Sequence, residues 1–312
     1  MKYAVIINPN AGKEEYRNKL MESLKAKNIP FYLTERAGHG AEIAKSLAEG
    51  GEEITIFGCG GEGTNFEIIN GIAEHKNVTL GIIPGGTGND FIKFFGSKEP
   101  FLDIDDQLKG RPFFIDLIKV QSGGKIYYGI NSCSAGMDAM VCKHTIKFKK
   151  LPIISGSAAY FLGIIHTLFC KFGKKMDFMI DGKPLSGIPS LFAVCANAPF
   201  YGGGYKCAPD ANPSDGKLNF SVIATKSKLK TITILGKYRR GEHTKLSYCH
   251  HGEVKAMEYY AEEPLPFNID GEVFEFKEVK CEVVPRAIKL MIPHSISENF
   301  DGVLTPVEKT LI

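Results

Sequence analysis

Apolar and polar positions alternate in blocks along the first 95 residues. Four short runs are apolar on both faces: "YAVIIN" (3–8), "FYLT" (31–34), "ITIFG" (54–58) and "TLGIIPG" (79–85). Such runs suit the strands of a parallel sheet that is covered by helices. Stretches with helical periodicity follow them, at 13–27, 41–49, 64–74 and 89–95. This alternation predicts an α/β domain with a doubly wound parallel sheet, whose ligands bind beyond the carboxyl ends of the strands.

The pattern changes between residues 117 and 124. From there on, short alternating strands are separated by Asp-Gly or Gly-Gly turns, which is typical of an all-β domain. The expected strands are 125–133, 176–185, 190–198, 217–224, 267–276 and 279–285. The sequence therefore predicts a first domain over 1–118 and a β-rich second domain over 119–287.

Composition adds only a few limits. The 312 residues are 44% hydrophobic and 23% charged with a net charge of +3, which is ordinary for a globular protein and excludes a largely disordered chain. Eight cysteines occur without a C-x-x-C pair, which favours a reduced, cytosolic chain with buried thiols, and the first residues lack a signal-peptide core. The cluster Cys249, His250 and His251 reads as a polar strand or loop rather than a zinc site, because adjacent side chains point to opposite faces.

Small-residue loops follow each of the four strands, and one of them, "GCGGEG" (58–63), matches G-x-G-x-x-G. A dinucleotide fingerprint belongs after the first strand and needs an acid about 20 residues further on, where this chain has "GIIPG". The P-loop pattern is also absent from the sequence. Bare glycine amides at a helix N-terminus still favour a phosphate group, with plain tight turns as the alternative.

Several strings resemble, in order, those of the diacylglycerol kinase catalytic domain family. These lipid kinases include the soluble bacterial enzymes and the sphingosine kinases, and NAD kinases are more distant relatives. The strings are "NPNAG" (8–12), "GGEGT" followed by "NFEIINGI" (60–72), "PGGTGNDF" (84–91), "FIDLIKV" (114–120), "GGGYKCAPDANPSDGKLNF" (202–220) and "NIDGE" (268–272).

The resemblance implies a nucleotide-binding α/β domain and a β-sandwich-like second domain, with the active site in the cleft between them and with residues 288–312 returning to the first domain. It implies ATP and Mg²⁺ as cofactors. Asp90 and Asp116 would join the Mg²⁺ and water network, although Asp90 also reads as a first-turn acid that stabilises its helix. The remaining residues of the implied nucleotide site are Asn8, Pro9, Asn10, Ala11, Gly12, Thr34, Gly61, Glu62, Gly63, Thr64, Asn65, Phe66, Glu67 and Thr87.

The resemblance also places the general base in "NIDGE". Asp270 would accept the proton of the lipid hydroxyl and Glu272 would hold or assist it. The alternative is an ordinary hairpin turn, because Asp-Gly between alternating residues is a strong hairpin signal. Asp181-Gly182 and Asp215-Gly216 have the same turn chemistry without a following acid.

A second implied metal site is a structural Mg²⁺ beside "PDANPSDGKL". Asp215 would supply the side-chain ligand, with the carbonyls of Asn212 and Lys217 as further ligands. A single carboxylate with carbonyls and water suits Mg²⁺. An ordinary turn without a metal stays open as the alternative.

One residue departs from the resemblance. The family has Asp where this chain has Glu62, which is one methylene longer. A misplacement of about 1 Å at a phosphate site can lower a rate on the order of 10²-fold. A catalytically weak regulator that binds nucleotide or lipid therefore stays open as a rival to a lipid kinase that uses diacylglycerol or another lipid alcohol. A second rival is a NAD kinase, whose family resembles the string at 60–64, although "NPNAG" and "PGGTGNDF" argue against it.

Between residues 139 and 176 the chain has no Asp or Glu, and lysines bracket the uncharged stretch 151–170. That stretch reads as a membrane span, as a helix packed into the second domain, or as a peripheral contact in which the lysines within 143–175 meet anionic headgroups. We expect the last two rather than a span, because Pro152, His166 and hydroxyl side chains interrupt it. The implied partner is a lipid alcohol at a membrane surface. We expect no binding of nucleic acid, and a homodimer is left open. The expected location is cytoplasmic with peripheral membrane association.

Overall fold

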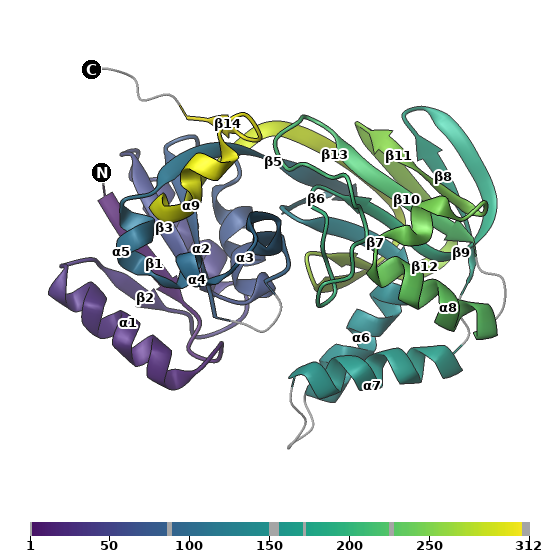
Figure 1. The fold of residues 1–312 in the computed structure, drawn as a ribbon, viewed down its shortest axis with the longest axis horizontal. Helices are drawn as coiled ribbons and strands as arrows, with labels where there is room; N and C mark the ends of the chain where they lie inside the picture. The colour runs from purple at the N-terminus through teal and green to yellow at the C-terminus, as the bar shows by residue number, and fades with distance from the viewer. Residues whose placement is uncertain (1, 86–88, 150–155, 171–172, 225–227, 308–312) are drawn as a thin grey trace. The chain divides into compact units, whose positions relative to one another are not determined.

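The computed structural model describes residues 2–85, 89–149, 156–170, 173–224 and 228–307 (Figure 1). The chain divides into two compact units, one formed by Met1–Leu117 and Val284–Ile312 and the other by Ile118–Val283. The sequence placed these divisions after residues 118 and 287.

A parallel sheet with the strand order β2-β1-β3-β4 forms the centre of the first unit. Its strands are β1 (Lys2–Ile7), β2 (Phe31–Leu33), β3 (Ile54–Gly60) and β4 (Val78–Pro84). β3 and β4 are buried along their whole length, as expected for strands that are apolar on both faces. All four strands expected in this half of the chain are therefore present, and they pair in parallel. β2 differs from the expectation of a covered strand, because it lies at the edge of the sheet with Tyr32 and Leu33 exposed.

Helices follow the first three strands, and apolar side chains of one of them pack against the sheet. They are α1 (Glu14–Ala26), α2 (His39–Ala48) and α3 (Glu62–Ile72). Leu20 and Leu24 of α1 are buried against Val5, Ile7 and Phe57 of the sheet. Burial of such aliphatic side chains contributes about 1.5–3 kcal/mol each.

The helix expected at 89–95 is a short 3-10 helix instead, η1 (Phe91–Phe95). Gly96, with a φ of 91°, follows it directly and ends it after five residues. The short helices α4 (Glu99–Leu102) and α5 (Ile104–Leu108), which the sequence pattern did not predict, come next. Asp103 caps α5 by accepting hydrogen bonds from the N–H groups of Asp105 and Asp106.

The last part of the described chain also belongs to the first unit. Lys289 and Leu290 of β13 (Glu272–Ile292) pair in parallel with Thr79 and Leu80 of β4. β5 (Arg111–Ser122) pairs with β13 and with β14 (Thr305–Pro306). The short helices α9 (His294–Ser297) and η3 (Glu298–Phe300) lie between β13 and β14 in the chain.

The second unit is built mainly of antiparallel strands in the order β11-β10-β9-β7-β12-β13. β6 forms a hairpin with β5, and β8 pairs with β9 and β12. The strands are β6 (Lys125–Gly129), β7 (Ser132–Gly136), β8 (Lys175–Ile180), β9 (Lys183–Ala196), β10 (Leu218–Ala224), β11 (Cys249–Val254) and β12 (Ala256–Ile269).

The single strand expected at 125–133 is two strands, β6 and β7. The interruption falls at Ile130 and Asn131, because the backbone N–H groups of these residues bind the side chain of Asp270 instead of a neighbouring strand. β12 also begins at Ala256, well before the expected position of 267. The expected strand at 279–285 is part of the long β13.

Helices cover one side of β9 in the second unit. They are α6 (Met137–Lys149), α7 (Gly156–Phe169) and α8 (Lys228–Arg239), with the 3-10 helix η2 (Glu242–Lys245) after α8. Val141 of α6, Ile164 of α7 and Ile234 of α8 share a core cluster with Leu191 and Phe192 of β9. Figure 1 shows α6 and α7 side by side, in teal. The uncharged stretch at 151–170 thus includes a helix packed into the second unit, and no described helix is long and apolar enough to cross a membrane.

All eight cysteines are free. Five of them are buried, namely Cys59, Cys133, Cys195, Cys207 and Cys281. Burial raises the pKa of the Cys133 thiol well above its usual value, so this thiol stays protonated. The cluster at 249–251 lies on β11, as a polar strand.

Candidate functional site

The loops after β1 and β3 are joined by side chains that the sequence singled out. Asn8 follows β1, and its Nδ2 donates a hydrogen bond to Thr64 Oγ1 in the first turn of α3, at 3.2 Å. The Oδ1 of Asn8 accepts from the backbone N–H of Asn10 at 2.9 Å. Asn8 thus fixes both its own loop and the start of α3. Pro9 and Ala11 complete this loop and are half-buried, whereas Asn10 is exposed.

The loops after β1 and β4 approach one another closely at two glycines. Gly12 has a φ of 71°, and a Cβ added to it would lie 2.3 Å from the carbonyl oxygen of Gly85. Gly85 N in turn donates to Gly60 O at 2.8 Å. Only glycine fits at position 12, and three loops therefore converge within the first unit.

The N-terminus of α3 faces this group of loops. Gly61 is its N-cap and makes no side-chain capping bond, and Glu62, Gly63 and Thr64 form the first turn. The first amides of an α-helix have no partner within the helix, and the helix dipole adds a partial positive charge there. Glu62 Oε1 accepts the backbone N–H of Asp90 at 3.2 Å, so the longer side chain reaches the segment after β4.

Two buried amide oxygens lie in the same segments without a partner among the described residues. They are Asn65 Oδ1 and Asn89 Oδ1. Asn89 Nδ2 donates to Gly60 O at 3.3 Å, which sets the orientation of its side chain. Buried polar atoms are normally paired, so these two oxygens mark a place where a polar group outside the described chain fits. The sequence motifs did not assign Asn89 to the site.

Some residues of the motif have structural roles. The carboxylate of Glu67 accepts the N–H groups of Gly38 at 2.8 Å and of Gly40 at 2.9 Å, and so ties α3 to the start of α2. Phe66 is buried. Thr34 N donates to Ile7 O at 2.9 Å and continues the pairing of β2 with β1. Thr87 lies outside the described residues.

The two acids assigned to Mg²⁺ are both almost completely buried. The Asp90 carboxylate forms an ion pair with the Lys93 ammonium. Asp90 is also the N-cap residue of η1, but its side chain makes no capping hydrogen bond. Asp116 Oδ1 accepts the backbone N–H of Arg286 at 2.7 Å. Arg286 has a left-handed φ of 52°, so Asp116 holds a strained residue in place.

Arg17 of α1 is a residue of this region that the sequence motifs did not indicate. Its Nη1 donates to the carbonyl oxygens of Ala11 at 2.8 Å and Gly12 at 2.9 Å. The arginine therefore turns the loop carbonyls toward α1. No sequence motif includes Arg17, because it is a single residue of a helix that the fold places beside the loop after β1.

Asp270 is both a turn residue and a buried carboxylate in the second unit. It has a φ of 48° and precedes Gly271, with a φ of 93°, in the hairpin between β12 and β13. Its Oδ2 accepts the N–H of Ile130 at 2.6 Å, and its Oδ1 accepts those of Asn131 at 3.0 Å and Ser132 at 2.8 Å. A carboxylate has four lone-pair positions, so one position remains beyond these three bonds.

Burial raises the pKa of Asp270 to about 6, although the three N–H donors oppose this rise. The residue is 6% exposed. A buried carboxyl group with a pKa near neutral pH can accept a proton and return it, which is what a general base requires.

Asp181 shows what the same turn does without burial. It precedes Gly182, has a φ of 46°, and accepts the N–H groups of Lys255 and of Ala256, the first residue of β12. Asp181 is exposed, however. The turn and contacts to backbone N–H groups are therefore common to both sites, and burial sets Asp270 apart. Glu272, half-buried, begins β13 and lies opposite Ile269.

The proposed ligands of the structural Mg²⁺ lie in consecutive turns. Asp215 Oδ1 accepts the N–H of Lys217 at 2.9 Å, and Asn212 Oδ1 accepts that of Ser214 at 3.1 Å. Burial raises the pKa of Asp215. These are the turn contacts expected for Asx residues, and the metal at this place stays a prediction.

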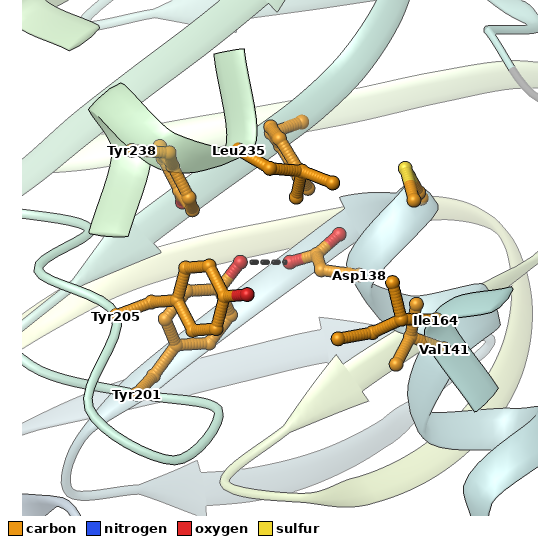
Figure 2. Close-up of a pocket in the computed structure, with 9 residues that line it drawn as sticks. Asp138, Val141, Ile164, Tyr201, Tyr205, Leu235 and Tyr238 are labelled. Carbon is orange, nitrogen blue, oxygen red and sulfur yellow. Dashed lines mark hydrogen bonds between the residues drawn. The ribbon is translucent and has the colours of Figure 1, made fainter. Parts of the chain in front are cut away.

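A small cavity lies between α6, α7, α8 and β9 (Figure 2). Its volume of about 20 Å³ gives room for about one water molecule and not for an acyl chain. Asp138 Oδ2 accepts the hydroxyl of Tyr201 at 3.0 Å. Burial raises the pKa of Asp138 to about 6. The family motifs did not indicate this acid.

Replacing Asp138 by Asn is expected to stabilise the protein at neutral pH. The pKa of Asp138 is about 6 in the folded chain against 3.8 unfolded. The folded state therefore binds the proton more tightly and loses stability as the pH rises from about 4 to about 6. Asn keeps an acceptor for Tyr201 without this loss. We expect a gain of up to about 3 kcal/mol in the free energy of unfolding at pH 8 and little gain at pH 4.

Urea denaturation of both proteins at the two pH values measures this difference. A gain of the same size at pH 4 and pH 8 would contradict the assignment of the effect to the Asp138 charge.

Two family models match the chain. The diacylglycerol kinase catalytic domain matches residues 2–120, and the YegS C-terminal NAD kinase beta sandwich-like domain matches residues 131–292. A diacylglycerol kinase of Staphylococcus carnosus (strain TM300) is 30% identical over 275 residues, which are 86% of this chain and 87% of that protein. A diacylglycerol kinase of Bacillus subtilis (strain 168) is 27% identical over 307 residues, 95% of this chain and 98% of that protein.

A solved structure from Bacillus anthracis str. Sterne has the same fold. It superimposes with a TM-score of 0.75 at 22% identity and covers 95% of this chain and 98% of that chain. The matches confirm a two-domain architecture in which an α/β domain precedes a sandwich-like β domain. The double winding of the first sheet stays a prediction.

Proposed function

Because the chain belongs to the family of bacterial diacylglycerol kinase-like lipid kinases, we propose that it transfers the terminal phosphate of ATP, with Mg²⁺, to the hydroxyl of a lipid alcohol. Diacylglycerol is the first candidate substrate, since relatives are named for it. The observation that carries the proposal is the buried carboxylate of Asp270 with its pKa of about 6.

The first unit is proposed to hold the nucleotide. The convergent loops at Asn8, Gly12 and Gly61, with Gly63 and Thr64 in the first turn of α3, present backbone N–H groups and small polar side chains that suit phosphate oxygens. The side-chain oxygens of Asn65 and Asn89, which have no partner among the described residues, support a polar guest beside them. Glu67, by contrast, acts by holding α2 against α3.

Asp90 and Asp116 are proposed to bind Mg²⁺ through its water shell, since buried carboxylates are the ligands that a hard cation prefers. The metal, when bound, neutralises charge on the phosphate oxygens during transfer. Lys93 holds Asp90 by an ion pair, so its ammonium competes with a cation for that carboxylate.

In the second unit, Asp270 is proposed to accept the proton of the lipid hydroxyl through its remaining lone-pair position. Three backbone N–H groups fix the orientation of the carboxylate, so little reorganisation is needed. Glu272, two residues further on, is proposed to assist. The Mg²⁺ proposed at Asp215, Asn212 and Lys217 has a structural role and takes no part in the transfer.

The test is transfer of labelled phosphate from ATP to a mixed lipid extract, with and without Mg²⁺. We expect one labelled lipid class that depends on Mg²⁺, and its identity names the substrate. Labelling of NAD⁺ instead would overturn the proposal in favour of a NAD kinase. Tight ATP binding without transfer to either acceptor would favour a regulator.

The regulator alternative depends on Glu62, and a variant tests it directly. Glu62 bonds the N–H of Asp90, which a shorter side chain cannot reach in the same backbone position. A hydrogen bond to a charged group contributes about 1.5–3 kcal/mol. We therefore expect Glu62→Asp to lower the rate of transfer by about 10- to 100-fold. A higher rate in Glu62→Asp, measured in the same lipid assay, would show instead that Glu62 impairs the enzyme.

A cytoplasmic kinase that acts on a bilayer lipid must contact a membrane. We propose that the pair of helices α6 and α7, called here the α6–α7 hairpin, makes this contact. Phe169 is 81% exposed at the end of α7, and Ile146 and Ile165 are partly exposed on the same hairpin. Lys147 and Lys174 are exposed nearby in the chain, whereas Lys143 is paired with Glu275. The lysines at 149, 150 and 171 lie outside the described side chains.

Phe169→Ser is expected to weaken binding to vesicles that contain anionic lipid by about tenfold, since an exposed Phe contributes at most about 1.5–3 kcal/mol on burial. Co-sedimentation with such vesicles measures the effect. Ile126→Ser is the matched control, because Ile126 is 48% exposed on β6, outside the hairpin. Equal losses in both variants would contradict the assigned surface.

A further inference from the structure

Two histidines and a cysteine meet near one end of the α6–α7 hairpin. His144 lies on α6, His166 lies one turn before the end of α7, and Cys170 follows α7 directly. One ligand atom from each residue lies within 4.8 Å of the other two. The Nδ1 atoms of His144 and His166 are 3.3 Å apart, and the Sγ of Cys170 is 3.5 Å from Nδ1 of His166.

Two of the three separations match edges of a tetrahedral metal site, and the third, between His144 and Cys170, lies within 4.8 Å. Zinc binds imidazole nitrogen at about 2.0–2.1 Å and thiolate sulfur at about 2.3 Å. Tetrahedral angles then place two nitrogens about 3.3 Å apart, and a nitrogen and a sulfur about 3.6 Å apart. The two distances found here agree with these values within about 0.1 Å, before any change of side-chain conformation.

The alternative is a plain hydrogen-bonded cluster. Thr167 donates its hydroxyl proton to Gly163 O at 2.7 Å, so its contact with His144 Nδ1 at 2.9 Å requires a proton on that nitrogen. The proton of His144 Nδ1 is then shared between Thr167 Oγ1 and His166 Nδ1, and the Cys170 thiol is the other group at His166 Nδ1, 3.5 Å away. A metal ion would replace these shared contacts by one bond from each of the three ligand atoms.

The donor set also selects the kind of metal. Two imidazoles and one thiolate suit zinc and its neighbours, and they do not suit Mg²⁺ or Ca²⁺, which prefer oxygen ligands. Among the described residues no fourth His, Cys, Asp or Glu joins the group. His166 is exposed, so the fourth position faces solvent.

We propose that His144, His166 and Cys170 bind one divalent transition metal ion such as Zn²⁺, with water as the fourth ligand. The proton balance is simple. The thiol proton of Cys170 leaves as the thiolate forms, and neutral His144 moves its proton from Nδ1 to Nε2, so one proton is released for each metal ion bound. The bound site carries a charge of +1, and Lys147 nearby makes the affinity weaker than that of a site with acidic neighbours.

The metal would fasten α6 to the last turn of α7. The metal would add to the contact that His144 already makes with the buried Thr167 at 2.9 Å. The site is distinct from the nucleotide loops and from Asp270, and the proposal does not rest on the kinase activity.

Titration of the full-length, untagged chain with Co²⁺ tests the proposal. We expect one equivalent to bind, with a thiolate-to-cobalt charge-transfer band in the near ultraviolet and the intense visible bands of tetrahedral cobalt. Zn²⁺ should displace the cobalt, and it should raise the midpoint of thermal unfolding by about a few degrees.

Cys170→Ser should abolish the charge-transfer band, and His166→Ala should weaken binding by at least about tenfold. Cys142→Ser, a half-exposed cysteine on α6, and His250→Ala, an exposed histidine on β11, are the matched controls and should leave both signals unchanged. Absence of the band at stoichiometric cobalt, or its persistence in Cys170→Ser, would overturn the proposal.

Discussion

Replacing Asp270 by Asn is expected to lower the rate of phosphate transfer by about 10²- to 10⁴-fold, which is the usual contribution of a general base. Asn cannot accept the substrate proton. Its Nδ2 would also face one of the three N–H groups that the carboxylate accepts, those of Ile130, Asn131 and Ser132. The measurement is the initial rate of lipid labelling with saturating ATP and Mg²⁺.

A structural defect could lower the rate as well, and two controls separate the causes. Asp181→Asn changes the same turn chemistry at an exposed site and should keep the full rate. ATP affinity, which we assign to the first unit, should be unchanged in Asp270→Asn. A rate that remains within threefold of the parent, with the thermal midpoint preserved, would remove Asp270 from the mechanism.

The pH dependence gives a further check on the same residue. With its pKa near 6, Asp270 is charged and able to accept a proton only above that pH. The rate of transfer should therefore rise as the pH increases through about 6 and then level off. A flat profile across this range would count against Asp270 as the base.

Gly12→Ala is expected to weaken the binding of ATP. The added Cβ would lie 2.3 Å from the carbonyl oxygen of Gly85, so the loop after β1 and the loop after β4 must move apart. The left-handed φ of 71° adds about 1–2 kcal/mol of strain for a residue with a Cβ. We expect ATP affinity to fall by at least about tenfold, because the phosphate-binding loops lose their arrangement. Equilibrium binding of ATP measures this.

Gly51 provides the matched control for backbone strain. Its φ is 74°, nearly the same as that of Gly12, but no atom lies within 4 Å of an added Cβ. Gly51→Ala should therefore lose stability through strain alone and keep its affinity for ATP. If both variants lose stability equally and neither loses affinity, the close approach of Gly12 to Gly85 has no role in nucleotide binding.

Local patterns in the sequence predicted the elements of the first unit well. The strands β1 and β3 could be predicted because continuous apolar runs leave no solvent face. The helix expected at 64–74 is α3, which begins two residues earlier, at Glu62. The helix expected at 89–95 was wrong in type, since Gly96 ends it too early for an α-helix.

Side-chain partners far apart in the chain could not be predicted. The sequence offered two readings of Asp270, a turn residue or a functional carboxylate, and the structure shows the turn together with a buried carboxylate. Its N–H donors are about 140 residues away, and nothing local in "YGINS" marks them. His144 and His166 likewise meet only because α6 packs against α7.

At Val284 the chain returns to the first unit. This return affects the order in which the two units can be completed during synthesis. The second unit is one continuous segment, 118–283, and all of its residues are available before residue 284 emerges. The first unit is begun first, but β4 lacks its parallel neighbour until Lys289 and Leu290 have been made. The part of the chain that is translated first therefore completes its sheet last, and its loops acquire their final support only after all residues of the β-rich unit have been synthesised.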